Sequence, residues 1–436
     1  MDKAILDLSR KIKDKQLKIA VIGLGYVGFP LALEFSRKSV SVVGIEIDHD
    51  RLKSIINRQS YISDIRNKEL RRSLDSGYFK ASADFSEIKN ADVVLICVPT
   101  PLKGKNLPDI SFIKKAVKEA ALYIKRGALV ILESTTYPGT TEEEILPIFQ
   151  ARGFVHEKDF YLCFSPERID PGNKRFPVHK IPKVVGGLSP KATHLAMLVY
   201  GIIIKQVVPV SSARCAETVK LLENTFRLIN IGLIDELSMM AHKMKIDIWE
   251  VVQAASTKPF GFMPFYPGPG VGGHCIPKDP LYLHWKAKSF GFHSRFIRLA
   301  SNVISYMPEY IVKRVEEALL KRNKKIKNSK ILVMGVTYKK DVKDLRKSPS
   351  IDVINSLRRY GARVSYSDPL IPFLKLKEID LKSIVLNNKK ISEFDCVLIA
   401  TDHSGVDYSL LLKNAKLVFD SRNVFRGKHK EKVERL

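Results

Sequence analysis

The sequence predicts an α/β protein in which two doubly wound, parallel sheets are joined by a central helical region with one long helix. Three observations support this fold class. Short apolar runs alternate with helix-compatible stretches in the first part of the chain, a helical pattern covers residues 213–244 with Gly232 as its one glycine, and the opening pattern returns near residue 330. We therefore expect three domains, over residues 1–210, 211–325 and 326–436.

The first domain is expected to begin with the strand KIAVIGLG and a helix from about Pro30, followed by a second strand, SVVGIEID. The apolar runs ADVVLICVPT and GALVILEST come next, each after a helical pattern. Because strands and helices alternate in this way, the strands are predicted to lie parallel with helices packed on the sheet.

A glycine motif joins the first strand to the first helix. Gly23, Gly25 and Gly28 form GxGxxG, in which the first glycine permits the turn, the second admits a pyrophosphate and the third lets helix and strand pack closely. This is the fingerprint of a Rossmann-like dinucleotide site, although a glycine turn that serves packing alone would have the same pattern. Tyr26 and Val27 lie within the motif and are expected to contact the cofactor.

An acidic residue at the end of the second strand indicates which dinucleotide binds. Glu46 lies 18 residues after Gly28, where a carboxylate would bind the ribose hydroxyls and repel a 2′-phosphate. The sequence therefore favours NAD over NADP as the cofactor. Arg51 could stack on the adenine, or it could be an ordinary surface residue at a strand end.

The pattern of residues 213–244 predicts one long helix that connects two α/β regions. Apolar residues recur along it at helical spacing, so we expect one face to lie in a core, formed by Val219, Leu222, Phe226, Ile229 and Leu233. The remaining apolar surface of the helix is expected to support a homodimer or a larger homo-oligomer.

After the charged stretch 321–330 the chain repeats its opening. KILVMGVTY resembles KIAVIGLGY, FDCVLIATDH resembles ADVVLICVPT, and RVSYSDP corresponds to the second strand of such a unit. The repeat predicts a second Rossmann-like domain that has lost the glycine fingerprint.

Composition limits the classes of function. The formal net charge of +27 would suit a nucleic-acid binder, but the basic residues are spread along the chain without interleaved aromatic residues, so we expect no nucleic-acid partner. The five cysteines show no CxxC or His/Cys spacing, which argues against a disulfide framework and a metal site. No stretch has the length of a membrane span or the pattern of a signal peptide, so we expect a cytoplasmic protein without membrane insertion.

Cys275 differs from the other four cysteines, which lie in apolar or helical contexts typical of small buried residues. Its segment, PGPGVGGHCIPKDP (267–280), contains four glycines and four prolines, and Asp279 follows four residues later. In an NAD enzyme a thiolate held in such a loop can attack an aldehyde. The thiohemiacetal then loses a second hydride and becomes a thioester, which leads to a carboxylic acid. The alternative is a buried, inert cysteine.

Three further segments carry polar residues suited to the same site. ESTTYPGTTEE (133–143) begins at the end of a predicted strand, where ligands gather in open α/β sheets. FSPERIDPGN (164–173) is a polar loop rich in proline and glycine. Lys220 and Asn224 are four residues apart on the long helix and share one face, although each alone could be a solvated polar position.

Seven motifs resemble, in order and spacing, those of the UDP-glucose/GDP-mannose dehydrogenase family: GLGYVGFPLA, VPTP, ESTTYPGTTEE, SPERIDPGN, KLLENTFRLIN, PGPGVGGHCIPKDP and GVTYKKDVKDLRKSP. The resemblance implies an NAD-dependent, four-electron oxidation of the C6 alcohol of a UDP-sugar to a carboxylate, for surface polysaccharide synthesis. SPERIDPGN and the cysteine motif most resemble the branch that oxidises UDP-N-acetylglucosamine. UDP-N-acetylmannosamine and UDP-glucose are the alternative substrates.

The resemblance also implies chemical roles for individual residues. Cys275 would be the nucleophile that carries the thiohemiacetal and the thioester. Lys220 and Asn224 would stabilise the oxyanion, because buried donors aimed at developing charge do so. Asp279 would assist proton transfer and the hydrolysis of the thioester.

Other roles implied by the resemblance concern water, cofactor and substrate. Glu167 and Thr136 would position the water, and Thr100 and Thr136 would contact the cofactor. Lysine and arginine side chains suit the diphosphate of a UDP-sugar. The residues expected to contact the UDP-sugar are Glu167, Arg168, Lys220, Asn224, Tyr266, Gly272, Tyr338, Lys339 and Arg422.

Overall fold

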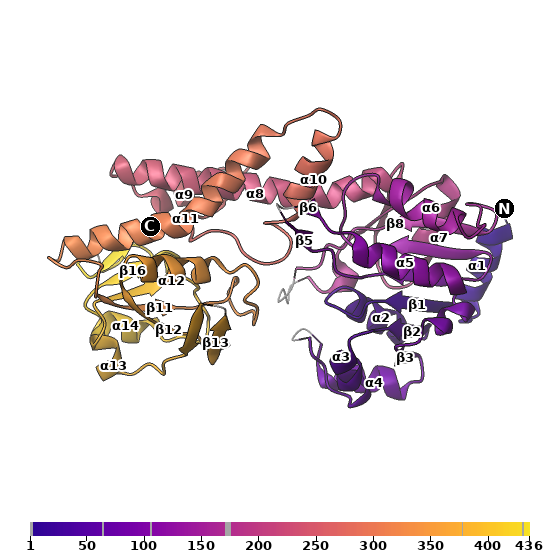
Figure 1. Ribbon diagram of the computed structural model, residues 1–436, viewed down its shortest axis with the longest axis horizontal. Coiled ribbons are helices and arrows are strands. Elements are labelled where there is room, and N and C mark those ends of the chain that lie inside the picture. Colours follow the sequence, from indigo (N-terminus) through magenta and orange to yellow (C-terminus); the bar gives the residue numbers. More distant parts are fainter. Residues whose placement is uncertain (1–2, 63–64, 105–106, 171–175, 377, 430) are drawn as a thin grey trace. The chain divides into compact units, whose positions relative to one another are not determined.

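The computed structural model describes residues 3–62, 65–104, 107–170, 176–376, 378–429 and 431–436. Its packing divides the chain into two units (Figure 1), which consist of Met1–Glu223 with Leu281–Phe292 and of Asn224–Pro280 with His293–Leu436. Each unit contains one large, mainly parallel sheet with helices, so the predicted α/β fold class is confirmed. The three domain boundaries expected from the sequence stay a prediction.

The first unit is built on an eight-stranded sheet in the order β10-β9-β8-β7-β4-β1-β2-β3. Neighbouring strands run parallel except for β8 and β9, which are antiparallel. The strands are β1 (Lys18–Ile22), β2 (Ser41–Ile45), β3 (Phe79–Ser82), β4 (Val93–Ile96), β7 (Ala128–Leu132), β8 (Phe160–Phe164), β9 (Lys183–Gly187) and β10 (Val207–Pro209). A short hairpin, β5 (Leu102–Lys103) and β6 (Leu107–Pro108), lies outside this sheet.

Helices cover both faces of this sheet, as Figure 1 shows. Val21 and Leu95 belong to one apolar cluster, whereas their neighbours Ala20 and Val94 belong to another, because successive strand residues point to opposite faces. The helices are α1 (Lys3–Lys13), α2 (Gly28–Arg37), α3 (His49–Ile56), α4 (Asn67–Asp75), η1 (Phe85–Asn90), α5 (Ser111–Tyr123), η2 (Thr141–Ile145), α6 (Leu146–Gln150), η3 (Val178–Lys180) and α7 (Pro190–Tyr200).

The second unit contains a five-stranded parallel sheet in the order β12-β11-β15-β16-β17. Its strands are β11 (Lys330–Met334), β12 (Arg363–Ser367), β15 (Cys396–Ile399), β16 (Val418–Asp420) and β17 (Val433–Arg435), with a separate hairpin of β13 (Phe373–Leu376) and β14 (Ile379–Lys382). Its helices are α9 (Ile248–Ala255), α11 (Arg295–Leu320), α12 (Pro349–Arg359), α13 (Asn388–Ser392) and α14 (Tyr408–Asn414). The sheet that the sequence repeat predicted is therefore present.

The second sheet lacks the full glycine fingerprint, as the sequence predicts, but it keeps the first glycine of the turn. Gly335 follows β11 as Gly23 follows β1, and both have positive φ angles, +79° and +90°. The second and third glycines of the motif are replaced by Thr337 and Lys340. The first glycine is retained because a Cβ at Gly335 would lie 2.3 Å from a backbone carbonyl oxygen.

Helix α8 (Ala213–Lys243) matches the predicted long helix, but its packed face differs from the prediction. Leu222, Phe226 and Leu233 are exposed, with 62%, 45% and 51% of their surface accessible, so the expected core face was wrong. The buried face instead combines small and polar residues, among them Ala216, Glu217, Lys220, Leu221, Asn224, Leu228, Gly232 and Asp235. A Cβ at Gly232 would lie 2.8 Å from the Ala300 Cβ of α11, so this face is packed too closely for large side chains.

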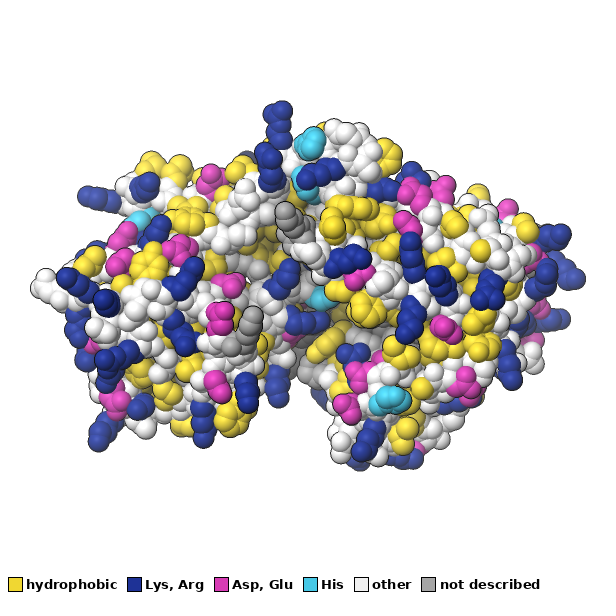
Figure 2. Space-filling model, viewed as in Figure 1, with side chains coloured by type: hydrophobic (Ala, Val, Ile, Leu, Met, Phe, Trp, Pro, Cys, Tyr) yellow, Lys and Arg dark blue, Asp and Glu magenta, His cyan; other side chains and the backbone are white. Residues whose placement is uncertain are grey.

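Charge is dispersed on the face of the molecule that Figure 2 shows. Lys and Arg side chains are scattered among acidic and apolar side chains over the visible face of each unit, without gathering in one patch (Figure 2). Among the residues that the structure describes, no helix combines the length and the apolar character needed to cross a bilayer.

Candidate active site

The three glycines of the turn between β1 and α2 differ in their surroundings. Gly23 has a φ of +90°, and a Cβ there would lie 2.8 Å from the carbonyl oxygen of Cys97. A Cβ at Gly28 would lie 2.0 Å from the Gly23 carbonyl oxygen, so only glycine lets α2 begin this close to β1. At Gly25, by contrast, a Cβ would meet nothing within 4 Å, which leaves the backbone open to a ligand. This turn fits the pyrophosphate of a dinucleotide.

Glu46 lies directly after β2 and is buried beside this turn. Its Oε2 accepts the Leu24 N–H at 3.1 Å, and its Oε1 accepts the Asp48 N–H at 3.0 Å. These bonds hold the carboxylate in place and leave further lone pairs that could accept ribose hydroxyls. The residues around the turn therefore fit the NAD that the sequence predicted.

Arg51 lies at the same edge of the sheet. Its guanidinium is 5.7 Å from the centroid of the Tyr61 ring, and its Nη1 is 3.7 Å from Glu46 Oε2. The Tyr61 hydroxyl donates to the Leu24 carbonyl, so this ring also supports the glycine turn. Stacking of Arg51 on adenine, like the contacts expected of Tyr26 and Val27, stays a prediction.

Hydrogen bonds to Glu217 of α8 hold the segment 133–143, which follows β7 and is called the threonine segment below. Glu217 is buried, and its carboxyl group accepts the Gly139 N–H at 2.5 Å, the Thr141 N–H at 2.8 Å and the Thr141 hydroxyl at 2.6 Å. Burial raises the pKa of Glu217 to about 7, although these hydrogen bonds act in the opposite direction. Within the segment, the hydroxyls of Thr136 and Thr140 lie 2.6 Å apart. Glu217 thereby fixes the shape of the loop that presents Thr136.

Other predicted residues of the first unit have defined surroundings. Thr100 is buried, and its carbonyl accepts the Tyr282 hydroxyl at 2.7 Å. Glu167 is buried after β8, and its carboxyl group accepts the N–H of Ile169. Arg168 forms an ion pair with Glu223 at 2.6 Å and donates to the Pro182 carbonyl at 2.8 Å.

The arrangement gives Arg168 two partners within the protein, so its proposed contact with substrate stays a prediction. The end of the 164–173 loop lies outside the described residues.

In the second unit, Asn224 and Asp279 form a buried pair. The Asn224 Nδ2 donates to Asp279 Oδ2 at 2.7 Å, and Asp279 is the first residue of α10 (Asp279–Lys288). An acidic side chain is stabilised at a helix N-terminus because the backbone N–H groups there carry partial positive charge. Lys220 lies one helical turn before Asn224 on α8 and is also buried, so the two predicted residues share the packed face.

The loop of Cys275 packs closely against the segment after β11. A Cβ at Gly272 would lie 2.6 Å from the Lys347 carbonyl oxygen and 2.6 Å from the Tyr338 Cβ. At Gly273, which has a φ of +85°, a Cβ would lie 2.6 Å from Tyr338 Cε2. The glycines therefore let this loop lie against the Tyr338 ring, while Cys275 itself is exposed. The structure brings together the cysteine loop and a predicted substrate residue.

Arg422 meets the beginning of the same loop. Its Nη1 lies 2.6 Å from where a Cβ on Gly268 would be, and its Nε donates to the Ala400 carbonyl at 2.8 Å. Asp235 of α8, which is fully buried, accepts the Gly268 N–H at 3.1 Å through Oδ1. Burial raises the pKa of Asp235 to about 8, although the Gly268 N–H and the charge of Arg422 lower it. Asp235 thus anchors the loop close to a predicted substrate arginine.

Two remaining predicted residues lie in the second unit. Lys339 is half-buried, and its carbonyl accepts the Thr337 hydroxyl at 2.9 Å. Tyr266 is 53% exposed, and its ring stacks on Trp249 at a centroid distance of 5.8 Å. The contacts of both with substrate stay predictions. Among the described residues, no group of three or more His, Cys, Asp or Glu side chains could hold a metal ion.

Sequence reasoning missed the supporting residues Glu217 and Asp235. Both lie on the face of α8 that also carries Lys220 and Asn224, three residues before the lysine and eleven after the asparagine. Polar residues at this helical spacing share one face, but they are typical of a solvated face, so the spacing alone could not show that this face is packed. The expectation of small, buried cysteines was also wrong for Cys215, which is exposed on α8.

The sequence matches three consecutive family models. They describe the NAD binding domain, central domain and UDP binding domain of the UDP-glucose/GDP-mannose dehydrogenase family, and they match residues 17–204, 214–304 and 332–427. The chain belongs to this family. It is accordingly an NAD-dependent UDP-sugar dehydrogenase with a Rossmann-like N-terminal domain.

Known members of the family are similar to this dehydrogenase over most of its length. UDP-N-acetyl-D-glucosamine 6-dehydrogenase of Salmonella typhi is 35% identical over 89% of this chain and 90% of its own length. The protein of the same name from Pseudomonas aeruginosa is 37% identical over 82% and 84%. The structure of UDP-D-ManNAc dehydrogenase from Pyrococcus horikoshii has a TM-score of 0.85 at 34% identity, covering 93% of this chain and 96% of that one.

Proposed function

We propose that this dehydrogenase oxidises the C6 alcohol of UDP-N-acetylglucosamine to the carboxylate in a four-electron reaction. The observation that carries the proposal is the loop of Cys275, whose glycines pack against Tyr338 and Arg422 in the unit that contains the Asn224–Asp279 pair. The relatives named for UDP-N-acetyl-D-glucosamine support this sugar. UDP-N-acetylmannosamine and UDP-glucose are the alternative substrates, and a relative named for UDP-N-acetyl-D-mannosamine is 34% identical.

Cys275 provides the covalent chemistry. NAD, when bound, accepts a hydride, and the oxidation of an alcohol to an acid requires two such transfers. After the first, the thiolate of Cys275 adds to the C6 aldehyde and forms a thiohemiacetal. Loss of the second hydride leaves a thioester, and water then releases the carboxylate and the thiol. The exposed position of Cys275 on a fixed loop suits attack on a substrate carbon.

Charge stabilisation is assigned to the packed face of α8. Lys220 and Asn224 carry N–H donors that can stabilise the oxyanion of the tetrahedral intermediates, and their burial strengthens such interactions. Asp279, which accepts a hydrogen bond from Asn224, is assigned to proton transfer and thioester hydrolysis. Glu167 and Thr136 are assigned to positioning the water.

Substrate binding is assigned to residues around the cysteine loop. Lys339 and Arg422 would pair with the diphosphate, because ammonium and guanidinium groups donate several hydrogen bonds to phosphate oxygens. Tyr338 would contact the same ligand. The further proposed contacts are Gly272, Tyr266, Glu167 and Arg168.

We further propose that the enzyme is a homodimer or a larger homo-oligomer in the cytoplasm. The support is the apolar stripe of α8, since Leu222, Phe226 and Leu233 are exposed in the single chain. Light scattering should therefore give at least twice the 49.3 kDa of one chain. The UDP-uronic acid product would serve surface polysaccharide synthesis.

The decisive experiment counts the NADH formed per sugar consumed. Purified protein is supplied with NAD and, separately, with UDP-N-acetylglucosamine, UDP-N-acetylmannosamine and UDP-glucose. Two NADH per sugar would support the double oxidation, and the substrate with the highest kcat/KM identifies the sugar. One NADH per sugar would mean that the reaction stops at the aldehyde, and no NADH from any of the three would refute the proposal.

Cys275→Ser tests the covalent step. The serine hydroxyl can still add to the aldehyde, but its ester hydrolyses poorly, so turnover should fall at least about a thousandfold with sugar retained on the protein. Cys215→Ser is the matched control, because that cysteine is also exposed and lies on α8 outside the cysteine loop. Near-normal turnover of Cys275→Ser would remove the proposed role.

A further inference from the structure

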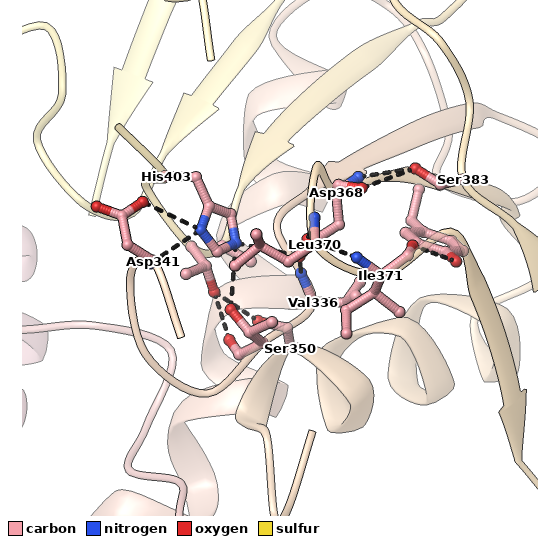
Figure 3. Close-up of polar contacts among 12 residues, drawn as sticks. Val336, Asp341, Ser350, Asp368, Leu370, Ile371, Ser383 and His403 are labelled. Carbon is pink, nitrogen blue, oxygen red and sulfur yellow. Dashed lines mark hydrogen bonds and ion pairs between the residues drawn. The ribbon is translucent and has the colours of Figure 1, made fainter. Parts of the chain in front are cut away.

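A buried histidine in the second unit holds the segment 337–347, which contacts the cysteine loop. His403 is 1% exposed and follows β15. Figure 3 shows its ring between Asp341 and Asp368, with hydrogen bonds on both nitrogens. None of the roles proposed above uses this histidine, yet two of its partners, Thr337 and Asp341, belong to the segment 337–347 that carries Tyr338 and Lys339.

Asp368 provides the fixed end of this network. It lies directly after β12, and its Oδ2 accepts the Val336 N–H at 2.7 Å, as Glu46 after β2 accepts the Leu24 N–H. Its Oδ1 accepts the N–H of Leu370 at 2.8 Å. Although burial raises the pKa of Asp368, the hydrogen bonds from His403 and Val336 lower it below its ordinary value. An ionised carboxylate is therefore held rigidly by the turn after β11.

The protonation pattern of His403 follows from its partners. Its Nδ1 accepts the Asp341 N–H at 3.0 Å, so this nitrogen carries no proton. Its Nε2–H then donates to Asp368 Oδ2 and lies equally close to Thr337 Oγ1, at 3.1 Å from each. The imidazole thereby links the fixed carboxylate of Asp368 to the backbone of the segment.

The segment needs such an anchor because Asp341 has a φ of +59°, which is unfavourable for a residue with a side chain. Its carboxylate also accepts the N–H and the hydroxyl of Ser404 at 2.9 and 2.7 Å. Further along, the Arg346 carbonyl accepts the Gly273 N–H of the cysteine loop at 2.9 Å. One network thus runs from Asp368 through His403 to the backbone that supports the loop.

We propose that His403 is a positioning residue, whose Nδ1 holds the Asp341 N–H and so shapes the segment 337–347 for the UDP-sugar. The inference rests on the proposed function, because Tyr338 and Lys339 are assigned there to the substrate. The proposal assigns the anchoring role to one atom, Nδ1. Substitutions can therefore distinguish the effect of its hydrogen bond from the effect of ring packing.

Three substitutions in the full-length protein distinguish the role of Nδ1 from that of Nε2 in His403. His403→Asn places a carbonyl oxygen near the position of Nδ1, His403→Gln places an amide near Nε2, and His403→Leu keeps neither group. His194→Asn is the matched control, because His194 is exposed on α7 in the other unit.

The first measurement is hydrogen exchange of the peptides that cover residues 337–347, without ligand. Exchange at Asp341 should rise roughly tenfold in His403→Gln and His403→Leu, the effect of one lost buried hydrogen bond, and stay near the wild-type rate in His403→Asn. Wild-type exchange in all three variants, or an equal rise in all three, would overturn the assignment to Nδ1.

The second measurement is calorimetric titration with UDP and, separately, with NAD. The Kd for UDP should rise roughly tenfold in His403→Gln and His403→Leu but not in His403→Asn, and the Kd for NAD should not change. Unchanged UDP affinity in His403→Leu would overturn the inference. If the wild-type protein did not bind UDP, the proposed substrate class would fail, and the exchange measurement would still decide whether His403 anchors the segment.

Discussion

Replacing Glu217 by Gln tests whether burial or hydrogen bonding sets the charge of the carboxyl group that holds the threonine segment. Burial raises the pKa of Glu217 from 4.5 to about 7. Between these two pH values the folded chain binds a proton that the unfolded chain has released. The stability that this group contributes is therefore full below pH 4.5 and is lost as the pH rises through 7. A shift of this size corresponds to about 3 kcal/mol of unfolding free energy.

Glutamine does not titrate. The difference in unfolding free energy between wild type and E217Q therefore varies with pH only through Glu217, because the contributions of the other titrating groups are the same in both proteins and cancel. The chain has two tryptophans, Trp249 and Trp285, and they lie in different units. In a Trp249→Phe background, Trp285 fluorescence reports the first unit alone. Urea unfolding from pH 4.5 to 8 should show the advantage of Glu217 over glutamine shrinking by about 3 kcal/mol. A constant difference would mean that the three donors keep Glu217 ionised, and the reasoning from burial would be refuted.

Two further substitutions test the turn and the loop. Gly28→Ala puts a Cβ 2.0 Å from the Gly23 carbonyl oxygen and should cost about 2 kcal/mol or more and abolish NAD binding, whereas Gly25→Ala, which meets no atom within 4 Å, should lose NAD affinity but keep its Tm. A wild-type Tm for Gly28→Ala would contradict the packing argument. Asp235→Leu leaves the Gly268 N–H without its acceptor and should lower kcat/KM about tenfold or more, while Asp235→Asn should stay within about threefold. Equal losses in the two Asp235 variants would show that the hydrogen bond is not what matters.

Features that depend on neighbours in the sequence were predictable. The turn from β1 to α2 follows from Gly23 and Gly28, which are close in sequence and approach each other so closely that a Cβ at Gly28 would lie 2.0 Å from the Gly23 carbonyl oxygen. Helix α8 was predicted to end at residue 244 and ends at Lys243, because helix formation depends on local propensity and on the absence of proline.

The packed face of α8 was not predictable from apolar spacing, because its polar residues are buried by partners far away in the sequence. Glu217 accepts hydrogen bonds from residues 76 and 78 positions earlier, and Asp235 from a residue 33 positions later. His403 is likewise joined to Asp341 and Asp368 across 62 and 35 positions. A single sequence records that these residues are polar but not that each has a specific buried partner.

The divergence of the two glycine turns has a consequence for stoichiometry. Where Gly25 leaves open backbone in the first sheet, the second sheet has Thr337, a buried side chain bonded to the carbonyl of Lys339. The described part of the chain therefore offers one dinucleotide cradle, although the proposed reaction reduces two equivalents of NAD per sugar. In that proposed reaction the first NADH would have to leave and a fresh NAD would have to enter before the product is complete. The covalent bond to Cys275 would keep the half-oxidised sugar on the enzyme during that exchange, so that no free aldehyde escapes into solution.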